Sequence, residues 1–321
     1  MSSLDAEDST AEYPMTLGHM RSLRAGLLAL VLFSCRDKGN SAEDSARGSL
    51  PPVFPSGPAS STNWDVDAGP VMLISLGGST DSAAVILPEV TDSTIASVQG
   101  NSAPVAGLVF DLFGRGGKID GSTTVIPIQP PDVKQECDAW PPVKVRAAGS
   151  GWRIGFAGAH VQAIKLDSIE AMPSTDSAGL AVSLAETAAT LVNASDPAFR
   201  GLPFRVRSAY TFRLDSVDVV IADVVRSVNE EANPRIEHLL MIGEKRAGSV
   251  GKYNTGYYSR TAGAEETTQV TEVLAAVRIG SSRKPAVVVN IEYDDGRVLG
   301  LIERVAPGQW RSVWRSAFTD C

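Results

Sequence analysis

The stretch FRVRSAYTFRLDSVDVVIADVVRS, residues 204–227, gives the clearest indication of the fold class. It predicts two consecutive strands, Phe204–Leu214 and Val217–Ser227, because apolar side chains follow a period of two rather than 3.6. Every residue from Val219 to Ala222 is apolar, so both faces of the second strand are apolar. We therefore expect Val217–Ser227 to be a central strand that is buried on both sides.

The same pattern continues before and after this pair of strands. The strands predicted before it are Val71–Leu76, Ala83–Leu87, Val105–Phe113, Val143–Ala148, Trp152–Ala157 and Ala159–Ile169. Those predicted after it are His238–Lys245, Lys252–Arg260, Thr268–Ile279, Ala286–Tyr293, Val298–Val305 and Trp310–Phe318. Gly149–Gly151 is expected to join its two flanking strands into a hairpin, and Asp294–Gly296 is a second hairpin turn. Thr268–Ile279 also fits a helix, but its β-branched residues favour a strand.

One segment, residues 176–194 (DSAGLAVSLAETAATLVNA), has helical spacing instead. Its apolar stripe consists of Leu180, Leu184, Ala188 and Leu191. Ser174 or Asp176 is the expected N-cap, and the stripe is expected to pack against the core. The sequence therefore predicts a mainly β (α+β) fold, with antiparallel sheets in a meander and one principal helix at about 176–194.

Near the start of the chain, Ala25–Phe33 (AGLLALVLF) is strongly apolar but only nine residues long. A bilayer-spanning helix needs about twenty residues, whereas the apolar region of a signal peptide has about 7–15. Arg21 and Arg24 stand just before it, as in the positive region of a signal peptide. Because the residues before them are acidic and polar, the natural start is expected at Met15 or Met20.

Leu32-Phe33-Ser34-Cys35 follows this stretch and resembles the lipobox of a bacterial lipoprotein, although Phe33 is larger than the pattern prefers. The resemblance implies that Cys35 is diacylated and becomes the new N-terminus, which anchors the protein to a membrane. In enteric lipoproteins an Asp after the lipidated Cys retains the protein in the inner membrane. Arg36 stands there, so the resemblance implies the outer membrane. Plain secretion, an uncleaved anchor and a buried core helix are the other interpretations of the apolar stretch.

The chain is expected to divide by composition into three parts. They are a signal peptide at 1–34, a flexible Ser/Pro/Gly-rich tether at 35–66 and a β-rich globular region at 67–321. The globular region can form two lobes, 67–170 and 200–321, joined by the helix 176–194.

The chain has three cysteines, and the lipobox resemblance assigns Cys35 to lipid. Cys137 and Cys321 are then an even pair in an exported chain, which predicts a disulfide between them. The alternative is one buried and one free thiol. No Cys-x-x-Cys occurs, so redox catalysis and structural zinc find no support.

The 321 residues include 29 basic and 37 acidic side chains, for a net charge of −8. This acidic balance disfavours nucleic-acid binding, which needs a basic face to displace counterions. Phe113–Lys118 is glycine-rich but lacks P-loop spacing, so it predicts a turn, with an anion-binding nest as the alternative.

We predict no catalytic residues, no metal site and no cofactor. His160 and His238 lie in predicted strands, and no Gly-x-Ser-x-Gly motif accompanies them, so both are expected to be hydrogen-bonded strand residues. Asp167 and Glu170 are close in sequence, as are Asp294 and Asp295. General acid–base catalysis, however, needs two carboxyl groups that the fold holds at a fixed distance, which closeness in sequence does not establish.

Aromatic residues near the C-terminus are the candidate binding surface. Trp310 and Trp314 share strand parity with Phe318, and Tyr257 and Tyr258 lie in a nearby predicted strand. An exposed aromatic row can stack on sugar rings or on a partner protein. The alternative, which we favour, is a buried row that closes the core.

The function expected from the sequence is that of a lipid-anchored protein of the bacterial cell envelope. Its body is expected to be a non-catalytic binding or structural module, with an envelope protein or a glycan as partner. The alternative is an exported hydrolase whose carboxylate- or Ser-based site is assembled by the fold.

Overall fold

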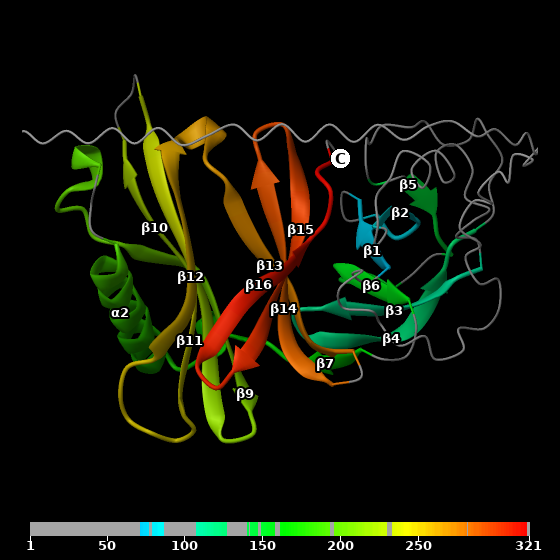
Figure 1. The fold of residues 1–321 in the computed structure, drawn as a ribbon, viewed down its shortest axis with the longest axis horizontal. Coiled ribbons are helices and arrows are strands. Elements are labelled where there is room, and N and C mark those ends of the chain that lie inside the picture. Colours follow the sequence, from blue (N-terminus) through cyan, green and yellow to red (C-terminus); the bar gives the residue numbers. More distant parts are fainter. Residues whose placement is uncertain are drawn as a thin grey trace, which may run out of the picture. The chain divides into compact units, whose positions relative to one another are not determined.

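A computed structural model describes residues 71–76, 79–86, 107–126, 140, 142–146, 149–157, 161–192, 196–229, 233–280 and 282–319. All of them belong to one compact unit, Ser49–Cys321. They form three antiparallel sheets and one α-helix, which confirms the expected mainly β fold with one principal helix (Figure 1).

Sheet 1 contains six strands in the order β4-β3-β6-β1-β2-β5. The strands are β1 (Met72–Ser75), β2 (Ser82–Ile86), β3 (Val109–Gly114), β4 (Gly117–Thr124), β5 (Pro142–Lys144) and β6 (Ile154–Ala157). The sheet closes on itself, because Val125 after β4 pairs with Val145 after β5. Side chains such as Phe110, Leu112 and Trp152 fill the enclosed core.

The hairpin predicted around Gly149–Gly151 is wrong. β5 and β6 stand at different places in sheet 1, since β5 pairs with β2 while β6 pairs with β1 and β3. β5 and β6 therefore form no hairpin, because non-local pairing overrides the local turn signal.

Sheets 2 and 3 are two five-stranded meanders of the same layout. Sheet 2 has the order β12-β11-β10-β9-β8 and sheet 3 the order β16-β15-β14-β13-β7. The strands of sheet 2 are β8 (Asp167–Ser168), β9 (Arg205–Leu214), β10 (Val217–Val228), β11 (Arg235–Arg246) and β12 (Asn254–Ala264). Those of sheet 3 are β7 (Gln162–Ile164), β13 (Val270–Ile279), β14 (Lys284–Tyr293), β15 (Gly296–Ala306) and β16 (Gln309–Arg315).

The strands of these two meanders can be compared with three of the sequence predictions. β10 is the central strand of sheet 2, as its two apolar faces predicted. Thr268–Ile279 forms strand β13 rather than a helix, after one short 3₁₀ turn, Glu265–Thr267. The single strand predicted at Ala159–Ile169 is instead split into β7, β8 and a 3₁₀ turn, Ile169–Ala171, so this segment supplies an edge strand to each meander.

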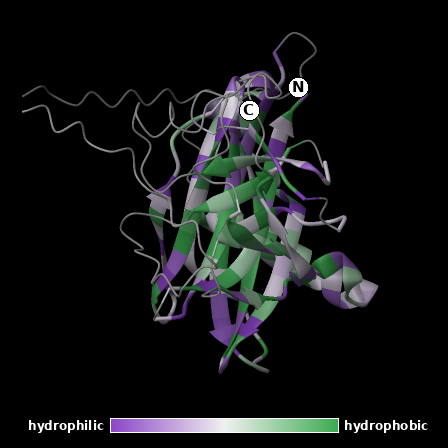
Figure 2. Ribbon diagram, turned by 90° about the vertical axis from the view of Figure 1, so that its right-hand side faces the viewer, coloured by the Kyte–Doolittle hydropathy of each residue, from purple (hydrophilic) through white to green (hydrophobic). Residues whose placement is uncertain are grey.

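The elements stack in four layers, because most strands bury both faces. On β10, Val220 and Val224 face α2, whereas Val219 and Ile221 face sheet 3. Sheet 3 buries its other face, including Leu301, against sheet 1. The order of layers is therefore α2, sheet 2, sheet 3 and sheet 1 (Figure 1). Hydrophobic residues accordingly cover the middle of the long strands, and hydrophilic ones gather toward their ends (Figure 2).

The principal helix, α2 (Ser174–Leu191), matches the predicted position but not the predicted N-cap. Its N-cap is Pro173, and no side chain caps it. Leu184 and Ala188 of the predicted stripe are fully buried against sheet 2. In the described part of the chain, no helix is both long and apolar enough to cross a bilayer.

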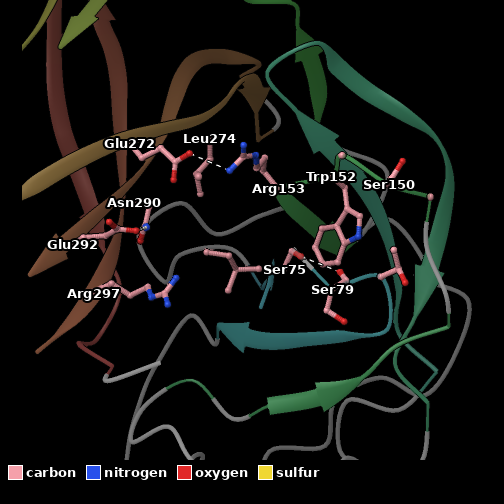
Figure 3. Close-up of a pocket in the computed structure, with 14 residues that line it drawn as sticks. Ser75, Ser79, Ser150, Trp152, Arg153, Glu272, Leu274, Asn290, Glu292 and Arg297 are labelled. Carbon is pink, nitrogen blue, oxygen red and sulfur yellow. Dashed lines mark hydrogen bonds and ion pairs between the residues drawn. The ribbon is translucent and has the colours of Figure 1, made fainter. Parts of the chain in front are cut away.

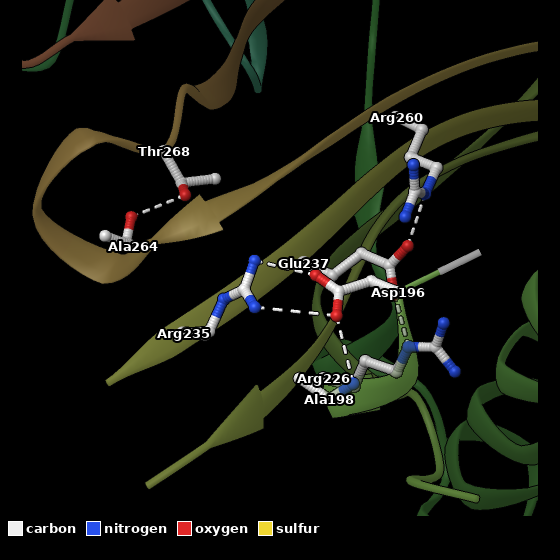
Figure 4. Close-up of polar contacts among 8 residues, drawn as sticks. All are labelled: Asp196, Ala198, Arg226, Arg235, Glu237, Arg260, Ala264 and Thr268. Atoms are coloured by element: carbon white, nitrogen blue, oxygen red, sulfur yellow. Dashed lines mark hydrogen bonds and ion pairs between the residues drawn. The ribbon is translucent and has the colours of Figure 1, made fainter. Parts of the chain in front are cut away.

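A cluster of buried charges holds one end of sheet 2 (Figure 4). The Glu237 carboxylate accepts hydrogen bonds from the guanidinium groups of Arg226 and Arg260. The guanidinium carbon of Arg226 also lies 4.5 Å from the centre of the Phe204 ring and 5.5 Å from that of Phe199. Beside it, Arg235 pairs with Asp196 at 2.7 Å, which ties the 3₁₀ turn Pro197–Phe199 to β11.

Candidate binding site

A cavity of about 380 Å³ lies at the seam between sheets 1 and 3. Sheet 1 contributes the end of β1, Ser79 and Thr80 before β2, and residues 149–153 before β6. Sheet 3 contributes side chains of β13, β14 and β15. Its volume is in the range of small-molecule binding sites, which runs from about 300 to 1,000 Å³. We name it the seam cavity (Figure 3).

Strand register places the polar groups of sheet 3 side by side in this cavity. Asn290 of β14 is paired with Glu272 of β13, and Glu292 of β14 is paired with Arg297 of β15. Asn290 and Glu292 share a face because side chains alternate along a strand. Val288 lies on the same face and packs against sheet 1. Toward one end of β14, this face therefore changes from apolar to polar side chains.

Ion pairs join the two sheets beside the cavity. The Glu272 carboxylate lies 2.5 Å from a terminal guanidinium nitrogen of Arg115 and 3.0 Å from one of Arg153. Arg115 also donates from Nε to the carbonyl oxygen of Val273 at 2.8 Å, and its guanidinium carbon lies 5.3 Å from the ring centre of Tyr210. The predicted turn at Phe113–Lys118 is confirmed. Arg115 in this turn connects sheet 1 to sheet 3 through its contacts with Glu272 and Val273.

Two residues that line the cavity each have a buried polar atom without a hydrogen-bond partner among the described residues: Nε1 of Trp152 and Oδ1 of Asn290. Trp152 is 4% exposed and Asn290 is 2% exposed. The amide nitrogen of Asn290 donates to Oε1 of Glu292 at 2.9 Å. Because a carboxylate only accepts, the amide oxygen must be the atom that is left over.

Such orphan atoms are costly, since each buried polar group without a partner destabilises the fold by about 1–3 kcal/mol. Native proteins therefore satisfy most of them, with protein, water or ligand. Among the residues that line the seam cavity, Trp152 carries an orphan donor and Asn290 an orphan acceptor, and the cavity is large enough for a small molecule. The cavity thus has the chemistry of a binding site.

The aromatic residues singled out from the sequence do not form one surface. Trp310 is 5% exposed and donates from Nε1 to the Glu244 carboxylate at 2.7 Å, in the core between sheets 2 and 3. Trp314 packs on the opposite face of sheet 3, against the core shared with sheet 1. The predicted common parity is wrong, because a bulge at Val313 places one extra residue between partners of β15 and reverses the alternation.

The two tyrosines also separate. Tyr257 packs against the core between sheets 2 and 3, whereas Tyr258, its neighbour on β12, is half exposed. Phe318 lies beyond β16, where its ring packs edge-on against Tyr293 at a centroid distance of 5.8 Å. The four candidate residues therefore form no single surface, since Trp310 and Tyr257 share one core while Trp314 and Tyr258 lie elsewhere, and none of them lines the seam cavity.

His238 is buried, as expected for a strand residue, and its Nδ1 lies 3.3 Å from Oδ1 of Asp223. Oδ2 of the same aspartate lies 3.4 Å from a terminal nitrogen of Arg207. Ser259 borders the same space, but that space holds only about 20 Å³, enough for about one water molecule. The pair links the neighbouring strands β10 and β11 within sheet 2.

The remaining candidates lie away from the seam cavity. Asp167 is on the edge strand β8 and pairs with Lys165 at 2.8 Å, while Glu170 is exposed in the following 3₁₀ turn. Asp294 and Asp295 form the predicted turn between β14 and β15. Four further residues with predicted roles lie outside the described residues: Cys35, Cys137, His160 and Cys321.

Over the described residues, no group of three or more His, Cys, Asp or Glu side chains is placed to hold a metal ion. Comparison with protein-family models, curated proteins and solved structures finds no match in any of the three. The candidate function therefore rests on the residues of this chain.

Sequence reasoning missed the seam cavity, although one signal points to it. Asn290 interrupts the apolar run Ala286–Ile291, and a polar residue inside such a strand needs a partner. Trp152 gives no comparable signal, because the sequence does not show whether the indole nitrogen of a buried tryptophan finds a partner.

Proposed function

We propose that this protein is an exported, lipid-anchored protein of the cell envelope whose body is a non-catalytic binding module. The observation that carries the binding role is the seam cavity with its two orphan atoms, Nε1 of Trp152 and Oδ1 of Asn290. A bound ligand would give both atoms the partners that they lack among the described residues.

The anchor is supported by the sequence before the globular region. Ala25–Phe33 is too short to span a bilayer, and Cys35 follows it at lipobox spacing. Two acyl chains hold a protein at a membrane stably, whereas one gives only reversible attachment. The Ser/Pro/Gly-rich segment 35–66 would hold the body away from the lipid, and Arg36 favours the outer membrane.

A binding role is favoured over the alternative, an exported hydrolase, because both carboxylates of the cavity already have partners within the protein. Glu272 is ion-paired with Arg115 and Arg153, and Glu292 accepts from Asn290. A carboxyl group that acts as a general acid near neutral pH is usually kept in an apolar, unpaired environment that raises its pKa. The lining of the seam cavity offers paired acceptors instead.

Labelling with a palmitate analogue tests the anchor. The wild-type chain should incorporate the label and sediment with membranes, and Cys35→Ser should lose both properties. Cys137→Ser is the matched control, because it removes a cysteine outside the lipobox and should keep the label. Label that persists in Cys35→Ser would refute lipid anchoring at this residue.

Protein stability tests whether Asn290 is retained for binding. Asn290→Leu removes an unpartnered polar atom from a buried site at similar volume, so its free energy of unfolding should stay within about 1 kcal/mol of wild type or rise. Thr271→Val on the neighbouring strand, outside the seam cavity, serves as the control. A loss of about 3 kcal/mol in Asn290→Leu alone would identify the amide as structural and would contradict the binding role.

A further inference from the structure

We infer that the ligand of the seam cavity is a neutral, hydroxyl-rich molecule, namely a sugar unit of a glycan. This inference rests on the proposed function and specifies the chemistry of its ligand. Three features carry it: the balance of charge, the kind of orphan atoms and the arrangement of the two walls.

The charges that line the cavity balance. The described lining includes two guanidinium groups, those of Arg153 and Arg297, and two carboxylates, those of Glu272 and Glu292. Arg153 and Glu272 are paired directly at 3.0 Å, and Glu292 and Arg297 are cross-strand partners. An anionic or cationic ligand would add a charge for which this lining holds no excess of the opposite sign, so a neutral ligand fits best.

The two orphan atoms need hydrogen-bond partners of opposite kinds. Nε1 of Trp152 can only donate and Oδ1 of Asn290 can only accept. A hydroxyl group both donates and accepts, so a molecule with several hydroxyl groups can satisfy both atoms with one kind of group. A ligand with acceptors alone, such as a carboxylate or a sulfate, would leave the amide oxygen of Asn290 unsatisfied.

The two walls offer different surfaces to such a ligand (Figure 3). The sheet 1 wall carries the indole of Trp152 with the hydroxyl-bearing residues Ser79 and Ser150. The sheet 3 wall carries planar polar groups, including the amide of Asn290 and the carboxylate of Glu292. Aromatic and planar hydrogen-bonding groups together suit a sugar ring, which has apolar faces and polar edges.

A peptide is less well suited to this cavity. Peptides are commonly recognised by adding a strand to an open sheet edge, where main-chain groups are free. β14, which supplies Asn290 and Glu292, is paired on both sides by β13 and β15. Its contribution to the cavity is therefore made by side chains on the sheet face.

Nuclear magnetic resonance of the tryptophan indole N–H groups tests the inference on the full chain. The chain has five tryptophans, and the signal of Trp152 is the one that disappears in Trp152→Phe. The probes are cellobiose and N,N′-diacetylchitobiose as neutral sugars, glucuronate and glucosamine as charged ones, and the blocked peptide N-acetyl-Ala-Ser-Ala-amide. A site with a Kd tighter than about 1 mM is nearly saturated at about 10 mM probe.

We expect at least one neutral disaccharide to shift the Trp152 signal and the charged sugars to shift it less. Asn290→Leu should weaken that binding about tenfold or more, because it removes the acceptor from the site. Trp314→Phe is the control: it removes an indole that packs near the same interface but does not line the cavity, so affinity should be unchanged.

Three outcomes would overturn the inference. No shift with any probe, or stronger binding of a charged sugar than of both neutral ones, would exclude a neutral sugar. A shift with the blocked peptide alone would assign the cavity to peptides, and the proposed binding module would stand. Failure of the palmitate label would instead contradict the proposed anchoring without touching the sugar result, so the two failures are distinguishable.

Discussion

Glu244 shows how a single buried carboxylate joins two sheets. It lies on β11 of sheet 2, yet it accepts two hydrogen bonds of 2.7 Å from Arg304 of sheet 3. It also accepts from the Gly308 N–H at 3.0 Å and from Nε1 of Trp310 at 2.7 Å. Burial by itself raises the pKa of Glu244, but these hydrogen bonds outweigh it, so the pKa lies below the ordinary value of 4.5.

We predict that this carboxylate makes the stability of the protein fall in acid. A pKa that is lower in the folded than in the unfolded state contributes stability above pH 4.5, and this contribution is lost as the pH falls through the folded value. Glu244→Gln should therefore unfold with a shallower pH dependence below pH 4.5 than wild type, as measured by urea titration at several pH values. Glu266→Gln, an exposed glutamate, is the control, and equal slopes in Glu244→Gln and wild type would contradict the assignment.

The buried ion cluster of Figure 4 leads to a prediction of a different kind. Glu237 is fully buried and Arg226 is 6% exposed, so removing one partner leaves a buried charge without compensation. Glu237→Met and Arg226→Met should each lower the free energy of unfolding by about 3–5 kcal/mol. The double variant should lose less than the sum of the two, which a double-mutant cycle in urea measures; simple additivity would show that the two charges do not interact.

At this scale the sequence reveals the type of residue but not its neighbours. Asn290 is visible as a polar interruption in an apolar strand, yet its partner Glu272 is known only once β13 and β14 are paired. Trp310 and Trp314 were expected on one face, and a single bulged residue, Val313, separates them. Bulges depend on how a whole strand fits its partner, so local alternation does not reveal them.

At the scale of elements, strands after residue 200 were predictable because each carries its own turn signals. The hairpin turn Asp294–Gly296 separates β14 from β15 as expected, and a turn at Pro307-Gly308 separates β15 from β16. Prediction failed where pairing is non-local: β5 and β6 are neighbours in sequence but lie apart in sheet 1. The seam cavity could not be predicted from the sequence for the same reason, because its walls come from distant segments of the chain.

Two glycine substitutions test how these elements are built. Gly179 lies in α2, where an added Cβ would meet nothing within 4 Å, so Gly179→Ala should stabilise the protein by about 0.5–1 kcal/mol. Gly256 lies in β12, where an added Cβ would be 2.5 Å from the carbonyl oxygen of Gly308, next to β16. Gly256→Ala should therefore destabilise the protein, because two backbones would have to separate.

Thermal unfolding followed by circular dichroism compares the pair, which makes the same chemical change in opposite surroundings. Stabilisation by Gly256→Ala would show that β12 and β16 do not approach closely at this point. A lower melting temperature for Gly179→Ala would mean that α2 is not continuous through Gly179.

At the scale of the whole molecule, sheet 3 decides how the layers depend on one another. It buries one face against sheet 2 and the other against sheet 1, so its residues belong to two hydrophobic cores at once. Losing either neighbour would expose an extended apolar face to water, which is unfavourable in proportion to its area. The Arg115 and Arg153 pairs with Glu272 further bind sheet 1 to sheet 3.

We therefore predict that residues 71–319 unfold as one cooperative unit rather than layer by layer. Phe156→Ala opens the core between sheets 1 and 3, and Ile221→Ala opens the core between sheets 2 and 3; both side chains are fully buried. The expected losses are about 3–5 kcal/mol for the phenylalanine and about 2–5 kcal/mol for the isoleucine. Val182→Ala, in an exposed position of α2, should change stability little and serves as the control.

The decisive measurement is whether different probes report the same transition in urea. Tryptophan fluorescence samples both cores, because Trp140 belongs to the one between sheets 1 and 3 and Trp310 to the one between sheets 2 and 3. If sheet 3 couples the layers, fluorescence and far-ultraviolet circular dichroism should give coincident transitions in wild type and in both alanine variants. An early separate transition in Phe156→Ala, with sheets 2 and 3 still folded, would show that sheet 1 is an independent unit and that the seam cavity can open without unfolding the rest.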